Sequence, residues 1–216
     1  MKNAVDPKAM TTSPVVRTRK RLTRQERAPA AREEIFAAAA KVVSEFGYLG
    51  TTVARITAEA GIAQGTFYLY FTSRQVLFDE LLPHVGEEML RYIGSRVSGA
   101  ADIYQMEERG FRAFFEYLKY NPGFFRILNE AESSAPVAYQ KYYKLLVTHY
   151  VASLKRGVES GQVRAFGSDE LETLAYVFMG ARGYLYVRYV KGRAKVGKLP
   201  ESVVQTYMKL IRNGLK

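Results

Sequence analysis

Apolar side chains recur every three or four positions through most of residues 30–216, which is the spacing of one face of a helix. The first such stretch, "AAREEIFAAAAKVVSEFG", is rich in alanine, the best helix former, and Gly47 stands where this helix should end. The alternation typical of a strand does not extend over a useful length anywhere. The pattern therefore predicts an all-α protein with helices at residues 30–46, 52–60, 63–71, 73–93, 102–120, 123–132, 137–160, 168–189 and 200–215.

The same pattern divides the chain into three parts. Residues 1–29 combine prolines with Thr, Ser and Arg and show no apolar period, so we expect a disordered basic arm. Residues 30–80 hold three short helices and the start of a fourth, and residues 81–216 form a larger helical unit. The boundary is expected within the fourth helix, near residues 78–85.

The second and third predicted helices are short and lie close together in "TTVARITAEAGIAQGTFYLYF". Thr52 suits the N-cap of the first, and Gly61 suits a left-handed turn between the two. Two helices joined in this way predict a helix-turn-helix, whose second helix enters the major groove of DNA. Its composition fits that surface, because Gln64 can pair with a base edge and Gly65 allows close approach.

The segment "TTVARITAEAGIAQGTFYLYFTSRQVLFDEL" resembles the DNA-binding signature of the TetR family of bacterial transcriptional regulators. The resemblance covers about residues 30–80 and says little about the rest, which varies freely in that family. Arg74 stands where the family usually has Lys, and Phe67 and Phe71 are interpreted as core. By position, the resemblance implies DNA contacts from Thr52, Ala63, Gln64, Gly65, Thr66, Tyr68, Tyr70 and Arg74.

Charge supports a nucleic-acid partner but does not establish one. The net charge is +11, and residues 1–30 carry eight Lys and Arg against Asp6 and Glu26, or +6. A basic arm favours anionic partners because binding releases counterions. "RTRKRLTRQER" either lies along the DNA backbone or in the minor groove, or is a solvated tail; the sequence leaves both open.

Composition excludes several other classes. The chain has no Cys and only two His, so we expect no disulfide and no metal site. No apolar run approaches the roughly 20 residues of a membrane helix, and the first residues lack a signal-peptide core, so we expect a cytoplasmic protein. No catalytic or phosphate-binding motif is present, and the acidic pairs Glu87–Glu88 and Glu107–Glu108 are interpreted as solvated. We therefore expect neither an enzyme nor a cofactor.

Aromatic residues are abundant after residue 80, with 13 Tyr and 7 Phe. They either fill a large core or line an apolar cavity. The resemblance favours the cavity, because the family binds small ligands in this domain. The candidate lining residues are Phe111, Phe114, Phe115, Phe124, Phe125, Tyr143, Tyr176 and Met179.

Two features bear on the ligand. "NPGFFRILNEAESSAP" is similar to segments of family members that sense lipids or acyl-CoA. A basic block could meet the phosphates of an acyl-CoA, although a solvated loop is the alternative; a fatty acid would need only the apolar cavity. The block comprises Arg182, Arg188, Lys191, Arg193, Lys195 and Lys198.

The last two helices are candidates for a dimer interface, because the resemblance implies that they pair across a two-fold axis into a four-helix bundle. Small residues on the eighth helix permit close approach, and the last helix has an apolar stripe. The alternative is that both stripes face the internal core. The candidate residues are Val177, Gly180, Ala181, Tyr184, Val203, Tyr207, Leu210 and Ile211.

Pro83 and Gly86 interrupt the fourth helix, which in the resemblance links ligand pocket to DNA. We interpret "LLPHVGEE" as a hinge; alternatively, one helix ends at Leu82 and another begins at Pro83.

Together these observations predict a ligand-responsive regulator, most simply a repressor that binds a near-palindromic operator as a homodimer and is released by a small hydrophobic ligand. The ligand could instead act as a corepressor, or the protein could bind DNA without sequence preference as an architectural protein.

Overall fold

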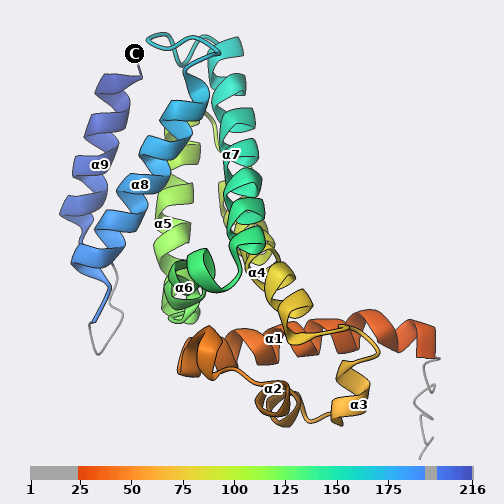
Figure 1. Cartoon of the computed structure of the whole chain (residues 1–216). Coiled ribbons are helices and arrows are strands. Elements are labelled where there is room, and N and C mark those ends of the chain that lie inside the picture. The colour runs from red at the N-terminus through yellow and green to blue at the C-terminus, as the bar shows by residue number, and fades with distance from the viewer. Residues whose placement is uncertain (1–23, 193–198, 216) are drawn as a thin grey trace, which may run out of the picture.

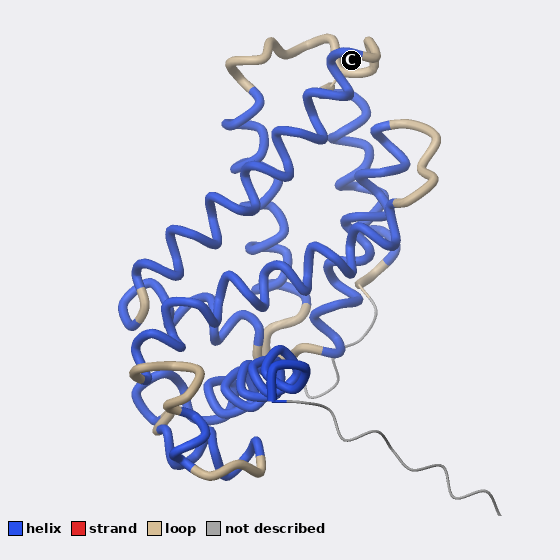
Figure 2. Tube along the Cα trace, turned by 90° about the vertical axis from the view of Figure 1, so that its right-hand side faces the viewer, coloured by secondary structure: helices blue, strands red, loops and turns tan. Residues whose placement is uncertain are grey.

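A computed structural model describes residues 24–192 and 199–215, and in these ranges the chain forms helices and loops without a strand (Figure 2). The expected fold class is confirmed. The helices are α1 (Arg24–Gly50), α2 (Val53–Ala60), α3 (Gln64–Phe67), α4 (Arg74–Val97), α5 (Ile103–Tyr120), α6 (Phe124–Ser134), α7 (Pro136–Glu159), α8 (Leu171–Tyr189) and α9 (Glu201–Gly214).

Two groups of helices are stacked end to end (Figure 1). Helix α1 lies across one end of the molecule with α2 and α3 beneath it, and we call α1–α3 the head. Helices α5–α9 lie above α1, and we call them the body. Helix α4 runs from the head into the body, so it is the natural mechanical connection between them.

The head has a small aromatic core. Phe36 of α1 packs edge-on against Phe71, with ring centroids 5.3 Å apart, and Phe71 lies beside Phe67 of α3. Phe67 and Phe71 are buried, as expected of core residues. Burial of such rings contributes roughly 1.5–3 kcal/mol each, which is how so short a helix as α3 is held in place.

Helix α1 begins earlier than predicted. It starts at Arg24, so residues 24–29, which we expected to be disordered, are helical and include Pro29. Proline removes one backbone hydrogen bond, but the flanking Ala, Arg and Glu are good helix formers. The rest of the arm lies outside the described residues. At Gly47, where we expected the helix to end, the backbone is non-helical, with φ 71° and ψ 172°, but α1 continues beyond this break to Gly50.

Helix α3 is shorter than the predicted span of residues 63–71. After Phe67 the chain continues as tight turns, with hydrogen bonds from Leu69 N to Thr66 O and from Tyr70 N to Phe67 O. Such i→i+3 bonds are common at helix ends. Tyr68 and Tyr70 therefore lie in the turn that follows α3 and not on a regular helix face.

Helix α4 is one continuous element that includes Pro83, so the alternative of two helices divided at Leu82 is wrong. Gly86 is buried against α7, where a β-carbon would lie 2.7 Å from Cδ2 of Tyr142. The glycine is thus required by close packing on a ring. Whether Pro83 acts as a hinge stays a prediction.

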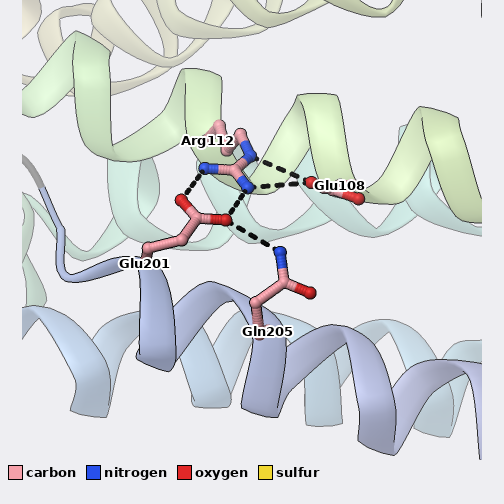
Figure 3. A network of polar contacts seen from close by, with 4 residues as sticks. All are labelled: Glu108, Arg112, Glu201 and Gln205. Carbon is pink, nitrogen blue, oxygen red and sulfur yellow. Dashed lines mark hydrogen bonds and ion pairs between the residues drawn. The ribbon is translucent and has the colours of Figure 1, made fainter.

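Polar contacts join α9 to α5 on the outside of the body (Figure 3). Arg112 of α5 donates to both carboxylate oxygens of Glu201, at 2.7 and 2.5 Å, and also to Glu108 on its own helix. Gln205 donates to Glu201 from the next turn of α9. The network fixes the start of α9 against α5.

Candidate DNA-binding head and ligand cavity

The turn between α2 and α3 is built as the sequence predicts. The Thr52 hydroxyl accepts a hydrogen bond from Arg55 N at 3.2 Å and caps α2. Gly61 adopts φ 67° and ψ 30°, a left-handed conformation that favours glycine, and ends the helix. These two residues set the angle at which α3 follows α2.

The candidate DNA-contacting residues lie at or near the surface of the head. Ala63, Gln64 and Gly65 are exposed, and a β-carbon at Gly65 would meet nothing within 4 Å. Tyr68 is 53% exposed, which is unusual for so large a ring. Thr66 and Tyr70 are half-buried. The start of α3 and the turn that follows it thus form an accessible surface.

Two exposed arginines contact the backbone next to this surface. Arg74 donates from Nη1 to the Thr51 carbonyl at 2.8 Å and lies over the Phe78 ring. Arg55, which sequence reasoning did not single out, donates to the Gly50 carbonyl and lies 4.1 Å from the Phe46 ring centroid. Arg74 therefore holds the loop before α2, in addition to the phosphate contact that the resemblance implies.

The body contains a cavity of about 570 Å³ between α4, α5, α6, α7 and α8. This volume lies in the range of small-molecule pockets. Most of its wall is apolar, and α4 contributes Met89, Leu90, Ile93 and Val97. The helix that enters the head therefore also forms one wall of the cavity.

Six of the eight candidate lining residues reach the cavity: Phe114, Phe124, Phe125, Tyr143, Tyr176 and Met179. Phe111 and Phe115 do not, and that expectation was wrong. Phe111 stacks on Tyr207 of α9 at 4.1 Å, and Phe115 packs against Phe111. Both rings are buried in packing with each other and with α9 instead, which aromatic content alone does not reveal.

Sequence reasoning missed the polar part of the cavity wall, which includes Glu107, Asn129, Tyr142, Tyr150 and Arg182. Burial raises the pKa of Tyr142 and of Tyr150 well above the ordinary tyrosine value. Both hydroxyls therefore remain protonated at neutral pH and keep an O–H donor.

Comparisons with known proteins agree with this arrangement. Residues 35–81, which span most of the head and the start of α4, match the family model described as bacterial regulatory proteins, tetR family. This chain is assigned to the tetR family through its head, by the match over residues 35–81. It is a DNA-binding transcriptional regulator by family.

Relatives extend the similarity into the body. The HTH-type transcriptional regulator YhgD of Bacillus subtilis is 24% identical over 134 residues, 60% of this chain and 70% of that protein. The HTH-type transcriptional repressor KstR2 of Rhodococcus jostii is 24% identical over 200 residues, 85% of this chain and 90% of KstR2. FadR of Bacillus subtilis, solved in complex with stearoyl-CoA, matches the fold with a TM-score of 0.68 at 19% identity, covering 85% of this chain and 99% of that one.

A stripe of exposed side chains follows α8 in this tetR-family fold. Val177, Gly180, Tyr184 and Val187 are three or four residues apart and exposed, Tyr184 by 81%. Ala181 is half-buried beside them. On α9, Leu210 is 67% exposed and Val203 is half-buried. Large apolar side chains at helical spacing on a surface indicate an interface.

Two of the candidate interface residues face inward instead. Tyr207 and Ile211 are 5% and 3% exposed, and Tyr207 packs on Phe111. They share one face of α9 because they are four residues apart, and that face covers α5. The expectation that both contact a second subunit was wrong.

Head and body are joined by polar contacts as well as by α4. Arg126 of α6 donates to the Ser44 and Glu45 carbonyls near the end of α1, at 3.2 and 2.7 Å. Near the start of α1, Nε2 of His84 lies 3.4 Å from Glu33 and 3.9 Å from Glu88. His84 also stacks on Phe36 at 4.1 Å. The position of α1 is therefore fixed at two places.

The basic block is not a single surface. Arg182 is buried, whereas Arg188 and Lys191 are exposed, and residues 193–198 lie outside the described residues. Glu107, expected to be solvated, is also buried. Separately, no helix in the described ranges is both long and apolar enough to cross a membrane.

Proposed function

We propose that the protein is a homodimeric repressor that occupies a near-palindromic operator and is released when a small hydrophobic ligand enters the cavity. The observation that carries this proposal is the apolar cavity of about 570 Å³ whose wall includes α4. Because α4 continues into the head, ligand and DNA act on one helix. Because the protein is assigned to DNA, we also assign it to the cytoplasm.

The coupling follows from the packing of α4. Its first turns bury Leu77 and Phe78, and Tyr48 of α1 contacts the Phe78 ring with centroids 4.7 Å apart. Its later turns present Met89 and Ile93 to the cavity. A ligand that fits one position of α4 better than another shifts the population of head positions. Typical coupling free energies are about 1–3 kcal/mol.

DNA recognition is assigned to the exposed surface around α3. Gln64 reads a base edge, Gly65 allows close approach, and Ala63 and Thr66 face bases. Thr52, Tyr68, Tyr70 and Arg74 contact phosphates, which position the head without reading sequence. Two heads of a dimer then read half-sites about 34 Å apart or more.

The exposed stripes of α8 and α9 are assigned to the second subunit. Tyr184 and Leu210 are the most exposed large side chains of these stripes, so a second subunit would bury most apolar surface there. The ligand is assigned to the lipid class, as a fatty acid or acyl-CoA derivative. Support comes from the apolar wall and from the stearoyl-CoA complex of the FadR structure.

Selection of bound duplexes from a random pool tests the DNA-binding part of the proposal. The full chain is expected to enrich a near-palindrome with two half-sites. Enrichment without any shared sequence would indicate an architectural DNA-binding protein instead. If ligand tightens binding to the selected duplex, the ligand is a corepressor and the sign of the proposal is reversed.

A further inference from the structure

An ion pair is buried in the wall of the cavity. Arg182 of α8 and Glu107 of α5 are 6% and 7% exposed, and Arg182 Nη2 donates to Glu107 Oε1 at 2.8 Å. The hydroxyl of Tyr207 on α9 donates to the same oxygen at 2.5 Å. A buried charge is tolerated only when it is paired and hydrogen-bonded, and these contacts provide both.

The guanidinium of Arg182 has further partners. Its Nη1 donates to the Phe178 carbonyl and to the Tyr207 hydroxyl, each at 3.3 Å. Arg182 Cζ lies 5.1 Å from the ring centroid of Tyr150 and 5.5 Å from that of Phe111. Burial lowers the pKa of Arg182, but the neighbouring Glu107 carboxylate outweighs burial, so the pKa is raised and the group stays charged.

These two residues balance the charge of the cavity. Among the described residues that line it, Glu107 and Arg182 are the charged ones, and His149 is the remaining ionisable base. A ligand carboxylate that entered would find Arg182 already neutralised and would be repelled by Glu107. Burying a third charge without a free partner is strongly unfavourable.

The second oxygen of Glu107 has a different property. Oε1 accepts from both Arg182 and Tyr207, whereas Oε2 accepts no hydrogen bond from the described residues. A carboxylate has acceptor capacity on both oxygens. Because Glu107 lines the cavity, a ligand that brings an O–H donor would satisfy this oxygen.

We propose that the cavity selects an uncharged, largely apolar molecule with a hydroxyl group that donates to Glu107, and that the Glu107–Arg182 pair excludes the matching free carboxylate. This inference rests on the proposed function, in which the cavity is the effector site. Within the lipid class it favours a neutral lipid with a hydroxyl group over the free fatty acid and over acyl-CoA, whose phosphates are charged.

Calorimetric titration of the full chain at neutral pH tests the inference with three probes of equal chain length: dodecanol, methyl dodecanoate and dodecanoate. Dodecanol is expected to bind at least about tenfold more tightly than dodecanoate, with the methyl ester, which lacks a donor, between them. Equal or tighter binding of dodecanoate overturns the inference while leaving the ligand-binding function intact. If none of the three binds, the proposed function fails as well.

A charge-removing variant makes the test specific to Glu107. Glu107→Gln leaves Arg182 as a cation without a carboxylate partner, so dodecanoate affinity is expected to rise by about tenfold or more and to overtake that of dodecanol. An unchanged affinity for dodecanoate contradicts the inference. The matched control is Glu108→Gln, the next residue on α5, which pairs with Arg112 on the outside and does not line the cavity.

A second variant keeps the test decisive if Glu107→Gln does not fold. Glu107→Leu with Arg182→Met removes both charges together, a change that buried ion pairs often tolerate. This double variant is expected to bind dodecanol and methyl dodecanoate equally, because the acceptor is gone. A retained preference for dodecanol would show that Glu107 does not receive the hydroxyl.

Discussion

The Glu130 carboxylate of α6 accepts a hydrogen bond from the backbone N–H of Tyr48 at 2.8 Å, so the body holds the end of α1 directly. The bond lies at the point where Gly47 interrupts the helix. Arg126 completes the contact, because its Nε donates to Glu130 Oε1 at 2.8 Å. The partly exposed Glu130 of α6 therefore helps to fix the position of the head.

Replacing Glu130 with Gln is expected to destabilise the protein by about 1 kcal/mol, since a charged hydrogen bond becomes a neutral one in a partly exposed site. Urea denaturation measures the change. Glu132→Gln, an exposed acid on the same helix, is the control and should be neutral. Equal effects from the two variants would mean that the Tyr48 bond contributes nothing.

The effect of Glu130→Gln also depends on pH in a defined direction. Burial raises the pKa of Glu130, but hydrogen bonds from Arg126 and from Tyr48 N outweigh it, so the pKa lies below the ordinary 4.5. Stability from a lowered carboxyl pKa is complete above the unfolded-state value and is lost as pH falls through the folded-state value. The difference in free energy of unfolding between wild type and Glu130→Gln should therefore be largest at neutral pH and decrease as the pH falls into the acid range.

Gly86→Ala tests the packing of α4 on α7. A β-carbon would lie 2.7 and 2.9 Å from Cδ2 and Cε2 of the Tyr142 ring, so we expect a loss of about 1–3 kcal/mol and weaker ligand binding, because Tyr142 lines the cavity. Gly94→Ala on the same helix meets nothing within 4 Å. It should stabilise by about 0.5–1 kcal/mol, since alanine favours helix. Thermal or urea unfolding compares the two, and a neutral Gly86→Ala contradicts the packing argument.

Gln64→Ala tests base reading by the head. The variant should lose about 1–3 kcal/mol of operator affinity and relax the preference at one base position of each half-site. Binding to selected duplexes with single changes, followed by fluorescence anisotropy, measures both. Gln140→Ala, an exposed glutamine on α7, controls for a general loss of amide side chains. A uniform loss across all sequences would assign Gln64 to the DNA backbone.

Tyr184→Glu tests the interface on α8. A charge placed in the centre of a covered apolar stripe should weaken dimerisation by about thirtyfold or more, corresponding to about 2 kcal/mol. Sedimentation at several concentrations measures it. Tyr120→Glu is the control, since Tyr120 is 66% exposed at the end of α5, away from the stripe. If both variants remain dimers of wild-type stability, the second subunit binds elsewhere.

Sequence reasoning located the helices and the turn of the head because these depend on local rules. Thr52 caps α2 and Gly61 closes it by interactions within five residues. The length of α3 was not predictable in this way. The chain turns tightly after Phe67, and this places the rings of Phe67 and Phe71 in the core beside α1. Local propensity does not contain that tertiary requirement.

The buried Glu107–Arg182 pair could be predicted only in part from the sequence. Glu107 lies four residues after Ile103 and four before Phe111, on the apolar face of α5, and Arg182 follows Phe178 by four on α8. Because each residue lies on the apolar face of its helix, its position could have indicated that its side chain is buried. That the two meet depends on how α5 and α8 pack, and no pattern within either helix specifies it.

The central claim is that an occupied cavity changes the affinity of the head for DNA. Fluorescence anisotropy of a labelled, selected operator duplex bound to the full chain, titrated with dodecanol, tests it most directly. The account predicts that saturating dodecanol raises the operator Kd by at least about fivefold, the lower end of typical coupling. An unchanged Kd, with calorimetry showing the cavity occupied, would contradict it.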